Sequence, residues 1–398
     1  MTNLTNSLQL MSLRTPYFLF DETRLEASVG AIKSALNRFW PNHIISYSVK
    51  TNNWNCILTR LLKLGVWAET VSVGEYNQAR ACGFAGDRII CNGVAKSREW
   101  IMQAIEDGAL LHLDGLDEVR DLVDVMKGRP VAFGVRVNAT EADFQSEPLS
   151  GPLGSRFGLS YRDGDLHELR LILDANPNLK LVSLHLHCNT KGRVASGYVW
   201  LTGFFARLVR EFRFTDIRTF DVGGSFGHDF DNPASGRWPD WPEYFAAIAQ
   251  VLTNEGFDCS TLRLAIEPGS ALISASADYF MQIVGERLFN GKRVLQTNGS
   301  RVHVDPHLAR ASFAGSITPV SLNNQPVDTD AEAVYLAGAT CLEKDRMDVN
   351  GAAARARKGD ILKVSKAAAY SYAMSPCSFI NPPPKVYVKL KSGEIVDA

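Results

Sequence analysis

The feature that most constrains the fold is an alternation of short β-type runs with helix-length amphipathic stretches between residues 44 and 271. The β-type runs are Ile44–Val49, Val66–Val71, Arg88–Cys91, Leu110–Leu113, Val131–Val137, Leu179–His187, Ile217–Val222 and Leu262–Ile266. The helical stretches include Gly74–Ala81, Trp100–Glu106, Leu116–Met126, Leu166–Leu173, Tyr198–Phe212 and Tyr244–Glu255. Eight such alternations predict an α/β fold, a (β/α)8 TIM barrel. A doubly wound open sheet competes, but the glycine fingerprint that usually follows its first strand is absent.

The alternation ends after about Ala271, and a turn-rich, strand-like sequence with few helical periods follows. Its candidate strands are Tyr279–Gly285, Lys292–Thr297, Ala333–Ala337, Asp360–Val364 and Lys385–Leu390. A further candidate, Pro16–Phe20, precedes the barrel and is expected to pair with these strands. The predicted domains are an N-terminal segment, 1–25, joining the β domain, a barrel over 26–271, and a mainly-β domain over 272–398.

Composition narrows the class of protein. Of the 398 residues, 45% are hydrophobic and 21% charged, so the chain can bury a large core. The net charge is −1 with both signs dispersed, which argues against nucleic acid or an anionic membrane as a partner. The seven scattered cysteines contain no C-x-x-C pair, a usage typical of reduced thiols. No signal peptide pattern or apolar run of roughly 18 residues is evident, and we expect a cytoplasmic protein.

Chemistry-bearing residues follow several of the predicted barrel strands. Lys50 follows the first strand, His185 and His187 end the sixth, a glycine-rich turn (220–227) follows the seventh, and Glu267 follows the eighth. A parallel barrel collects these strand ends at one mouth. An amine able to form a Schiff base, an imidazole, a glycine cradle for phosphate and a carboxylate are together the groups that pyridoxal 5'-phosphate requires.

Each of these residues also has a structural explanation. The glycines can be simple turn residues, and Glu267 can be a buried structural acid. His185 and His187 face opposite sides of a strand, so one of them can be a hydrogen-bonded core residue. The H-x-H pair also allows metal binding, but no carboxylate or cysteine at ligand spacing supports it, and we expect no metal. The order of all these residues together favours the cofactor site.

These residues resemble the fold-type III pyridoxal-phosphate decarboxylases that act on ornithine, lysine, arginine and diaminopimelate, over nearly the whole chain. Tyr47–Asn52 (YSVKTN) matches the family's Y-x-x-K-x-N signature, which implies that Lys50 is the Schiff-base lysine. Glu69–Glu75 (ETVSVGE) resembles its D-x-x-S-x-G-E stretch, and Arg156–Gly158 its K/R-F-G element. The resemblance implies a barrel followed by a β domain, as in alanine racemase.

The resemblance also implies roles for other residues. His187 corresponds to the histidine that stacks on the cofactor ring, and Glu267, in an E-P-G run with Gly269, to the partner of the pyridinium nitrogen. The phosphate-binding glycine loop corresponds to Gly223, Gly224 and Ser225, and the tyrosine that touches the phosphate corresponds to Tyr370.

One catalytic residue is implied to come from a second copy of the chain. Gly338–Asp345 (GATCLEKD) resembles a G-P-x-C-x-x-x-D element whose cysteine, here Cys341, reprotonates the product across a homodimer interface. The shared active site would complete a decarboxylase in which the cofactor accepts electrons as the α-carboxylate leaves.

The chain departs from the family pattern at three places. Ser270 stands where E-P-G-R has arginine, and Asp305 stands where the R-P-x-L-Y element of diaminopimelate decarboxylases has arginine. The histidine loop reads Cys188–Thr190 where glycine and serine are usual, so the phosphate contact is expected from Thr190. Losing two cations weakens the expectation of a second substrate carboxylate at that place.

We therefore predict a decarboxylase for a diamino acid or a conjugated derivative, for example in a siderophore or other natural-product pathway. Asp305, Glu343 and Asp345 are candidates to bind a distal cation. The alternatives are the diaminopimelate decarboxylase of lysine biosynthesis, an amino acid racemase of the same fold class, which would need a catalytic tyrosine in place of the cysteine, and a regulatory relative without cofactor.

Overall fold

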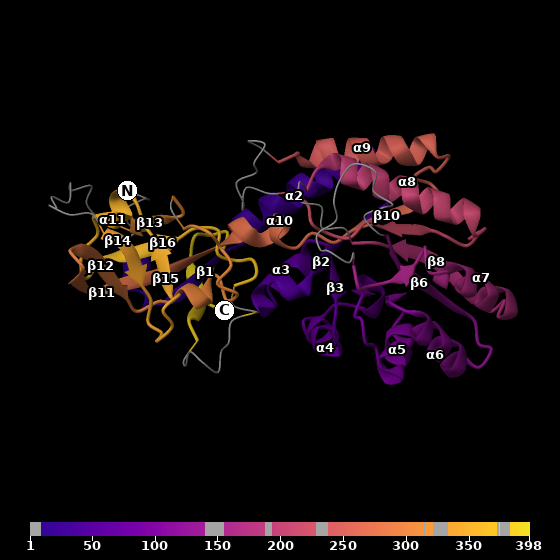
Figure 1. The fold of residues 1–398 in the computed structure, drawn as a ribbon, viewed down its shortest axis with the longest axis horizontal. Coiled ribbons are helices and arrows are strands. Elements are labelled where there is room, and N and C mark those ends of the chain that lie inside the picture. The colour runs from indigo at the N-terminus through magenta and orange to yellow at the C-terminus, as the bar shows by residue number, and fades with distance from the viewer. Residues whose placement is uncertain are drawn as a thin grey trace. The chain divides into compact units, whose positions relative to one another are not determined.

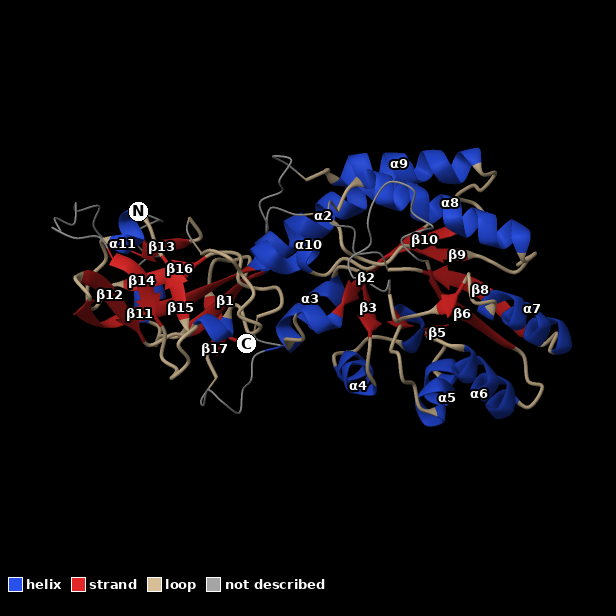
Figure 2. Ribbon diagram, in the orientation of Figure 1, coloured by secondary structure: helices blue, strands red, loops and turns tan. Residues whose placement is uncertain are grey.

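The computed structural model describes residues 9–139, 155–187, 193–227, 238–313, 315–320, 333–371, 374 and 383–398. The chain divides into two compact units, 28–272 and 1–27 together with 273–398. Figure 1 gives the order of the elements along the chain, and Figure 2 shows that helices surround the strands of the first unit whereas strands dominate the second. No helix in these ranges is both long enough and apolar enough to span a membrane.

The first unit is a closed parallel barrel. Its strands are β2 (His43–Ser48), β3 (Trp67–Thr70), β4 (Ile89–Cys91), β5 (Leu110–Leu113), β6 (Val131–Asn138), β8 (Leu179–His185), β9 (Thr219–Asp221) and β10 (Arg263–Ile266). They pair in chain order, and β10 pairs with β2 to close the ring. The short strand β7 (Leu159–Ser160) pairs with the end of β6. All eight predicted strand runs lie in this ring, and the TIM-barrel prediction is confirmed.

Helices alternate with these strands, as the apolar periods predict. They are α2 (Glu22–Phe39), α3 (Asn55–Lys63), α4 (Val73–Ala81), α5 (Arg98–Glu106), α6 (Leu116–Met126), α7 (Asp165–Ala175), α8 (Ala195–Glu211), α9 (Trp241–Asn254) and α10 (Ser270–Ile273). Local sequence sets several of their starts: Asp240 forms a capping box with Glu243 at α9, and Ser72 accepts the Glu75 N–H at α4. These caps set the first residues of α4 and α9.

The second unit is mainly β, as predicted. Its elements are β1 (Tyr17–Asp21), β11 (Ala277–Phe289), β12 (Lys292–Thr297), β13 (Ile317–Val320), β14 (Ala333–Ala337), β15 (Arg346–Asp348), α11 (Gly351–Ala354), β16 (Ile361–Val364), β17 (Lys385–Lys389) and β18 (Ile395–Asp397). The strand order is β15-β14-β12-β11-β1-β17-β18, and β16 joins β11 to β13. Buried β1 pairs antiparallel with β11 and parallel with β17, so the segment before the barrel belongs to this sheet.

Candidate active site

Five neighbouring strands deliver polar side chains to the carboxyl-terminal mouth of the barrel. Lys50 lies in a 3-10 turn, Val49–Thr51, directly after β2, and Glu69 lies near the end of β3. On the other side of β2, Glu267 follows β10, Asp221 ends β9 and His185 ends β8. Because the strands are parallel and adjacent, residues far apart in sequence share one site.

Four of these side chains, all except Asp221, line a cavity of about 390 Å³. Its lining contains Lys50, Glu69, Val71, Asn92, Val94, Arg136, Arg156, Phe157, His185, His187 and Glu267. Two guanidinium groups lie against the Phe157 ring, that of Arg136 at 4.5 Å and that of Arg156 at 4.1 Å from the ring centroid. The cavity has the size and the mixture of apolar and convergent polar groups that small-molecule sites require.

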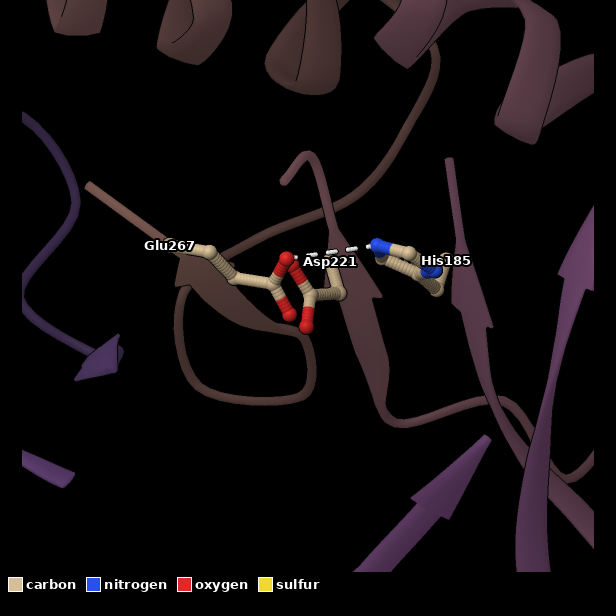
Figure 3. A group of neighbouring side chains, drawn as sticks. All are labelled: His185, Asp221 and Glu267. Atoms are coloured by element: carbon tan, nitrogen blue, oxygen red, sulfur yellow. Dashed lines mark ion pairs between the residues drawn. The ribbon is translucent and has the colours of Figure 1, made fainter. Parts of the chain in front are cut away.

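Two carboxyl groups and an imidazole meet at the base of this site (Figure 3). His185 Nε2 lies 3.3 Å from Glu267 Oε2, and the polar atoms of His185, Asp221 and Glu267 lie within 4.8 Å of one another. Burial, then the charge of Glu267 and a hydrogen bond with it, raise the pKa of Asp221 well above its usual value. Burial also acts to raise the pKa of Glu267, but His185 and the Asp221 hydrogen bond outweigh it and lower that pKa. Asp221 therefore holds the proton of the pair, and Glu267 is the anion.

A chain of hydrogen bonds reaches Glu267 from the opposite side. Asn92 Nδ2 donates to Glu267 Oε1 at 2.5 Å, which leaves Asn92 Oδ1 to accept from His112 Nδ1 at 2.7 Å. His112 Nε2 then accepts from the Ser183 hydroxyl at 2.7 Å. Burial lowers the pKa of His112 well below its usual value, in agreement with a neutral ring in this chain. The network fixes both the position and the ionisation of Glu267.

His187 lies against the glycine-rich turn after β9. Gly224 N–H donates to His187 Nδ1 at 3.0 Å, and the Ser225 hydroxyl lies 3.2 Å from His187 Nε2. A Cβ at Gly223, whose φ is +66°, would lie 2.9 Å from the imidazole, and one at Gly224 would lie 2.5 Å from the Glu267 carbonyl oxygen. Glycine is therefore required at both positions by close packing, and the turn brings its backbone up to the site.

Lys50 and Glu69 form a loose ion pair, with Lys50 Nζ 4.0 Å from Glu69 Oε2. Burial raises the pKa of Glu69 to about 7, although Lys50 opposes this shift. Glu69 Oε1 and His185 Nδ1 are buried and have no hydrogen-bond partner among the residues that the structure describes. An amine, a buried anion and open hydrogen-bonding atoms around one cavity fit a bound cofactor that carries an aldehyde, a ring nitrogen and a phosphate.

The other predicted site residues divide into four groups. Cys341 and Glu343 are exposed in the second unit, Tyr370 is 39% exposed there, and Thr190 lies outside the described residues. Gly269 lies where a Cβ would overlap the Thr51 hydroxyl, within the barrel unit. Asp305 and Asp345 are buried and have several partners in their own unit.

A family comparison decides what this site serves. Residues 23–274, well over half of the chain, match the family model described as "Pyridoxal-dependent decarboxylase, pyridoxal binding domain". The chain belongs to this family. The predicted fold type, the pyridoxal 5'-phosphate cofactor and the carboxy-lyase class are thereby confirmed.

Individual relatives agree with this family. A diaminopimelate decarboxylase of Archaeoglobus fulgidus is 26% identical over 96% of this chain and 88% of its own length. The structure of diaminopimelate decarboxylase from Helicobacter pylori complexed with L-lysine is 22% identical, with a TM-score of 0.82 over 98% of this chain and 95% of that one. The arginine decarboxylase of Paramecium bursaria Chlorella virus is 18% identical, with a TM-score of 0.77 over 97% and 99%. At these identities the two structures support the fold alone.

Sequence reasoning missed three residues that touch or support Glu267. Asp221, Asn92 and His112 lie at or next to the ends of predicted strands. A polar residue near the end of a barrel strand is the sequence signal that could have marked them as site residues. That signal does not say which polar residues meet, because each contact crosses between strands distant in sequence.

Proposed function

We propose that this pyridoxal-dependent decarboxylase is a cytoplasmic homodimer that removes the α-carboxylate of a diamino acid or of its conjugated derivative. A siderophore or other natural-product pathway is the setting that we favour. The observation that carries this proposal is the replacement of two family arginines by Ser270 and Asp305. Without those cations, a free second carboxylate at that place has lost its expected partners.

The surroundings of Asp305 support this proposal. Its Oδ2 accepts from Arg301 at 2.7 Å and from the Arg310 N–H at 3.0 Å, and its Oδ1 accepts the Ala309 N–H at 3.0 Å. Asp305 supplies no cation for a substrate carboxylate, and its own charge is paired with Arg301. The oxygens of Asp305 already accept hydrogen bonds from its own loop. Direct substrate binding by Asp305, Glu343 or Asp345 stays a prediction.

The barrel residues receive roles from their geometry. Lys50 would carry the cofactor covalently, His187 would pack on its ring, and Glu267 would face the ring nitrogen as an anion held by Asp221 and Asn92. The turn Gly223–Ser225, with Thr190, Gly269 and Tyr370, would bind the phosphate. When bound, the cofactor withdraws electrons from Cα. Glu267 favours this withdrawal because its charge keeps the ring nitrogen protonated.

Cys341 is proposed to deliver a proton to Cα from the partner subunit. The Cys341 side chain is exposed in a single chain, which agrees with a residue that enters the active site of a second copy. Replacement by alanine should leave cofactor binding intact and slow turnover or misdirect reprotonation. The matched control is Cys259→Ala, because Cys259 is also exposed but lies in the barrel unit away from the proposed site residues. Equal turnover and products in both variants would exclude the role of Cys341.

Diaminopimelate decarboxylase is the second candidate function. The names of the relatives favour it, although identities near a quarter leave room for a changed substrate. Turnover should be measured as CO2 release from ornithine, lysine, arginine, meso-diaminopimelate and citryl-conjugated diamines, alongside a racemisation assay. A preference for diaminopimelate over ornithine, lysine, arginine and the conjugates would overturn the proposed specificity for a diamino acid or its conjugate. Racemisation without CO2 release would replace decarboxylation by the racemase alternative.

A further inference from the structure

Ser225 has a backbone conformation that disfavours its own side chain. Its φ is +65°, in the left-handed region where a Cβ meets the following carbonyl group. Gly223 and Gly224 are needed in this turn because a Cβ there would collide with His187 or with the Glu267 carbonyl. A third glycine would relieve the turn of its remaining strain, so the serine side chain at this position calls for an explanation.

The hydroxyl of Ser225 faces one nitrogen of an imidazole whose other nitrogen is already bound. A backbone N–H can only donate, so His187 Nδ1, 3.0 Å from Gly224 N, must be the unprotonated acceptor. The proton of a neutral ring then lies on Nε2, from which it can be donated to Ser225 Oγ at 3.2 Å. Burial, followed by the charge of Lys50, lowers the pKa of His187 to about 3, which agrees with a neutral ring.

We propose that Ser225 is a positioning residue that accepts the Nε2 proton of His187 and holds the ring in one tautomer and one plane. The inference rests on the proposed function, in which His187 packs on the cofactor ring. A clamped neutral imidazole offers an aromatic face and keeps its proton, so His187 acts by packing and leaves proton delivery to another residue.

The serine has a second conceivable use that the experiment must separate. Its hydroxyl could bind the cofactor phosphate together with the backbone amides of the turn. Both Ser225→Ala and Ser225→Gly remove the hydroxyl and keep the backbone N–H, but only the glycine variant also removes the left-handed strain. Lys127→Gly is the matched control for strain relief, because Lys127 has a φ of +46° at the end of α6, within the barrel unit.

The decisive measurement is ¹⁵N NMR of the His187 ring in the full chain, with and without pyridoxal 5'-phosphate. We expect a protonated Nε2 and an unprotonated Nδ1, with Nε2–H exchanging with water about fivefold faster in both Ser225 variants, as the loss of about 1 kcal/mol of hydrogen bonding predicts. Lys127→Gly should leave this exchange unchanged. A His187 ring protonated on Nδ1 would overturn the proposal. So would an Nε2–H exchange rate that is the same in wild type and in both Ser225 variants.

Cofactor affinity and turnover complete the test. With Ser225 acting on His187, turnover should fall by about fivefold in both variants while the dissociation constant for pyridoxal 5'-phosphate stays within about twofold. A large rise in that constant with unchanged ring exchange assigns the hydroxyl to the phosphate and overturns the inference. Wild-type protein that never binds the cofactor would instead refute the proposed function. The ring tautomer is also measured without cofactor, so this result would leave the test of Ser225 intact.

Discussion

Buried acids occur in both units of this protein, and they differ in how their oxygens are used. Glu267 and Asp345 are almost equally buried, with exposed fractions of 3% and 4%. Both oxygens of Asp345 accept short hydrogen bonds, from Arg301 N–H at 2.7 Å, Ser300 Oγ at 3.0 Å, and the N–H and hydroxyl of Thr340 at 3.0 and 2.6 Å. In the barrel, acids instead contact one another beside a cavity, and Glu69 Oε1 has no partner among the described residues.

This difference separates a structural acid from a functional one. Asp345 saturates its acceptors with Thr340 of its own loop and with Ser300 and Arg301, which joins the turn between β14 and β15 to that distant segment. The barrel carboxyl groups remain close together and incompletely bonded, an arrangement that lowers stability unless a ligand uses it. Burial alone therefore does not identify a site; open hydrogen-bonding capacity beside a cavity does.

The largest expected effect comes from Glu267→Gln. Turnover should fall by about a hundredfold or more, because a neutral amide cannot hold a ring nitrogen in its protonated form. The free energy of unfolding should fall as well, because the lowered pKa of Glu267 means that its charge stabilises the folded chain, and an amide cannot accept all of its hydrogen bonds. Steady-state kinetics and urea unfolding of the same samples check both parts. An unchanged rate would remove Glu267 from the proposed mechanism.

Asp345→Asn should show the opposite behaviour. An amide cannot accept all four hydrogen bonds, so we expect the free energy of unfolding to drop by about 3 kcal/mol. The KM of the folded enzyme should be unchanged, as measured below the unfolding transition. A large increase in KM for diamino acids without loss of stability would restore Asp345 as a substrate-binding residue.

Glu69 makes the stability of cofactor-free protein depend on pH. Its pKa is raised to about 7 in the folded chain from 4.5, so between these pH values the folded state keeps a proton that the unfolded state has released. The contribution of Glu69 to stability should therefore fall as pH rises from 4.5 to 7, by as much as about 3 kcal/mol. Thermal unfolding of wild type and Glu69→Gln at several pH values tests this; a parallel pH profile in the variant would contradict it.

The smallest effect is expected for Asp305→Asn. The partly buried pair with Arg301 and the two backbone contacts should make the loss about 1 kcal/mol of unfolding free energy. Substrate preference should change little, because the asparagine still lacks the cation of the family arginine. Asp305→Arg is the matched variant for specificity: gain of diaminopimelate turnover in it would link this position to a substrate carboxylate.

The sequence predicted the barrel well because each strand has its own local pattern. All eight runs form the ring, since short β-branched segments alternate regularly with amphipathic helices. In the second unit β13, β15 and β18 were not predicted; each has only three or four residues, too few for a clear period. Local pattern thus recovers long or regular elements and loses short irregular ones.

The candidate site was predicted only in part, for a related reason. Lys50, His187 and Glu267 stand at strand ends in recognisable motifs, and the structure brings them to one cavity. The proton on Asp221 and the chain through Asn92 and His112 depend on contacts between different strands, which spacing along the sequence does not encode. The saturated bonding of Asp345 was hidden for the same reason, because Ser300 and Arg301 come from a distant segment.

The pairing of β1 with β11 and β17 has a consequence for synthesis. The ribosome makes β1 first, but its partners at residues 277–280 and 385–389 emerge only after the whole barrel. The barrel can therefore close before the sheet that contains β1 is complete. Until then the apolar run of Tyr17, Phe18, Leu19 and Phe20 remains uncovered. An uncovered apolar segment of this kind makes the unfinished chain prone to aggregate.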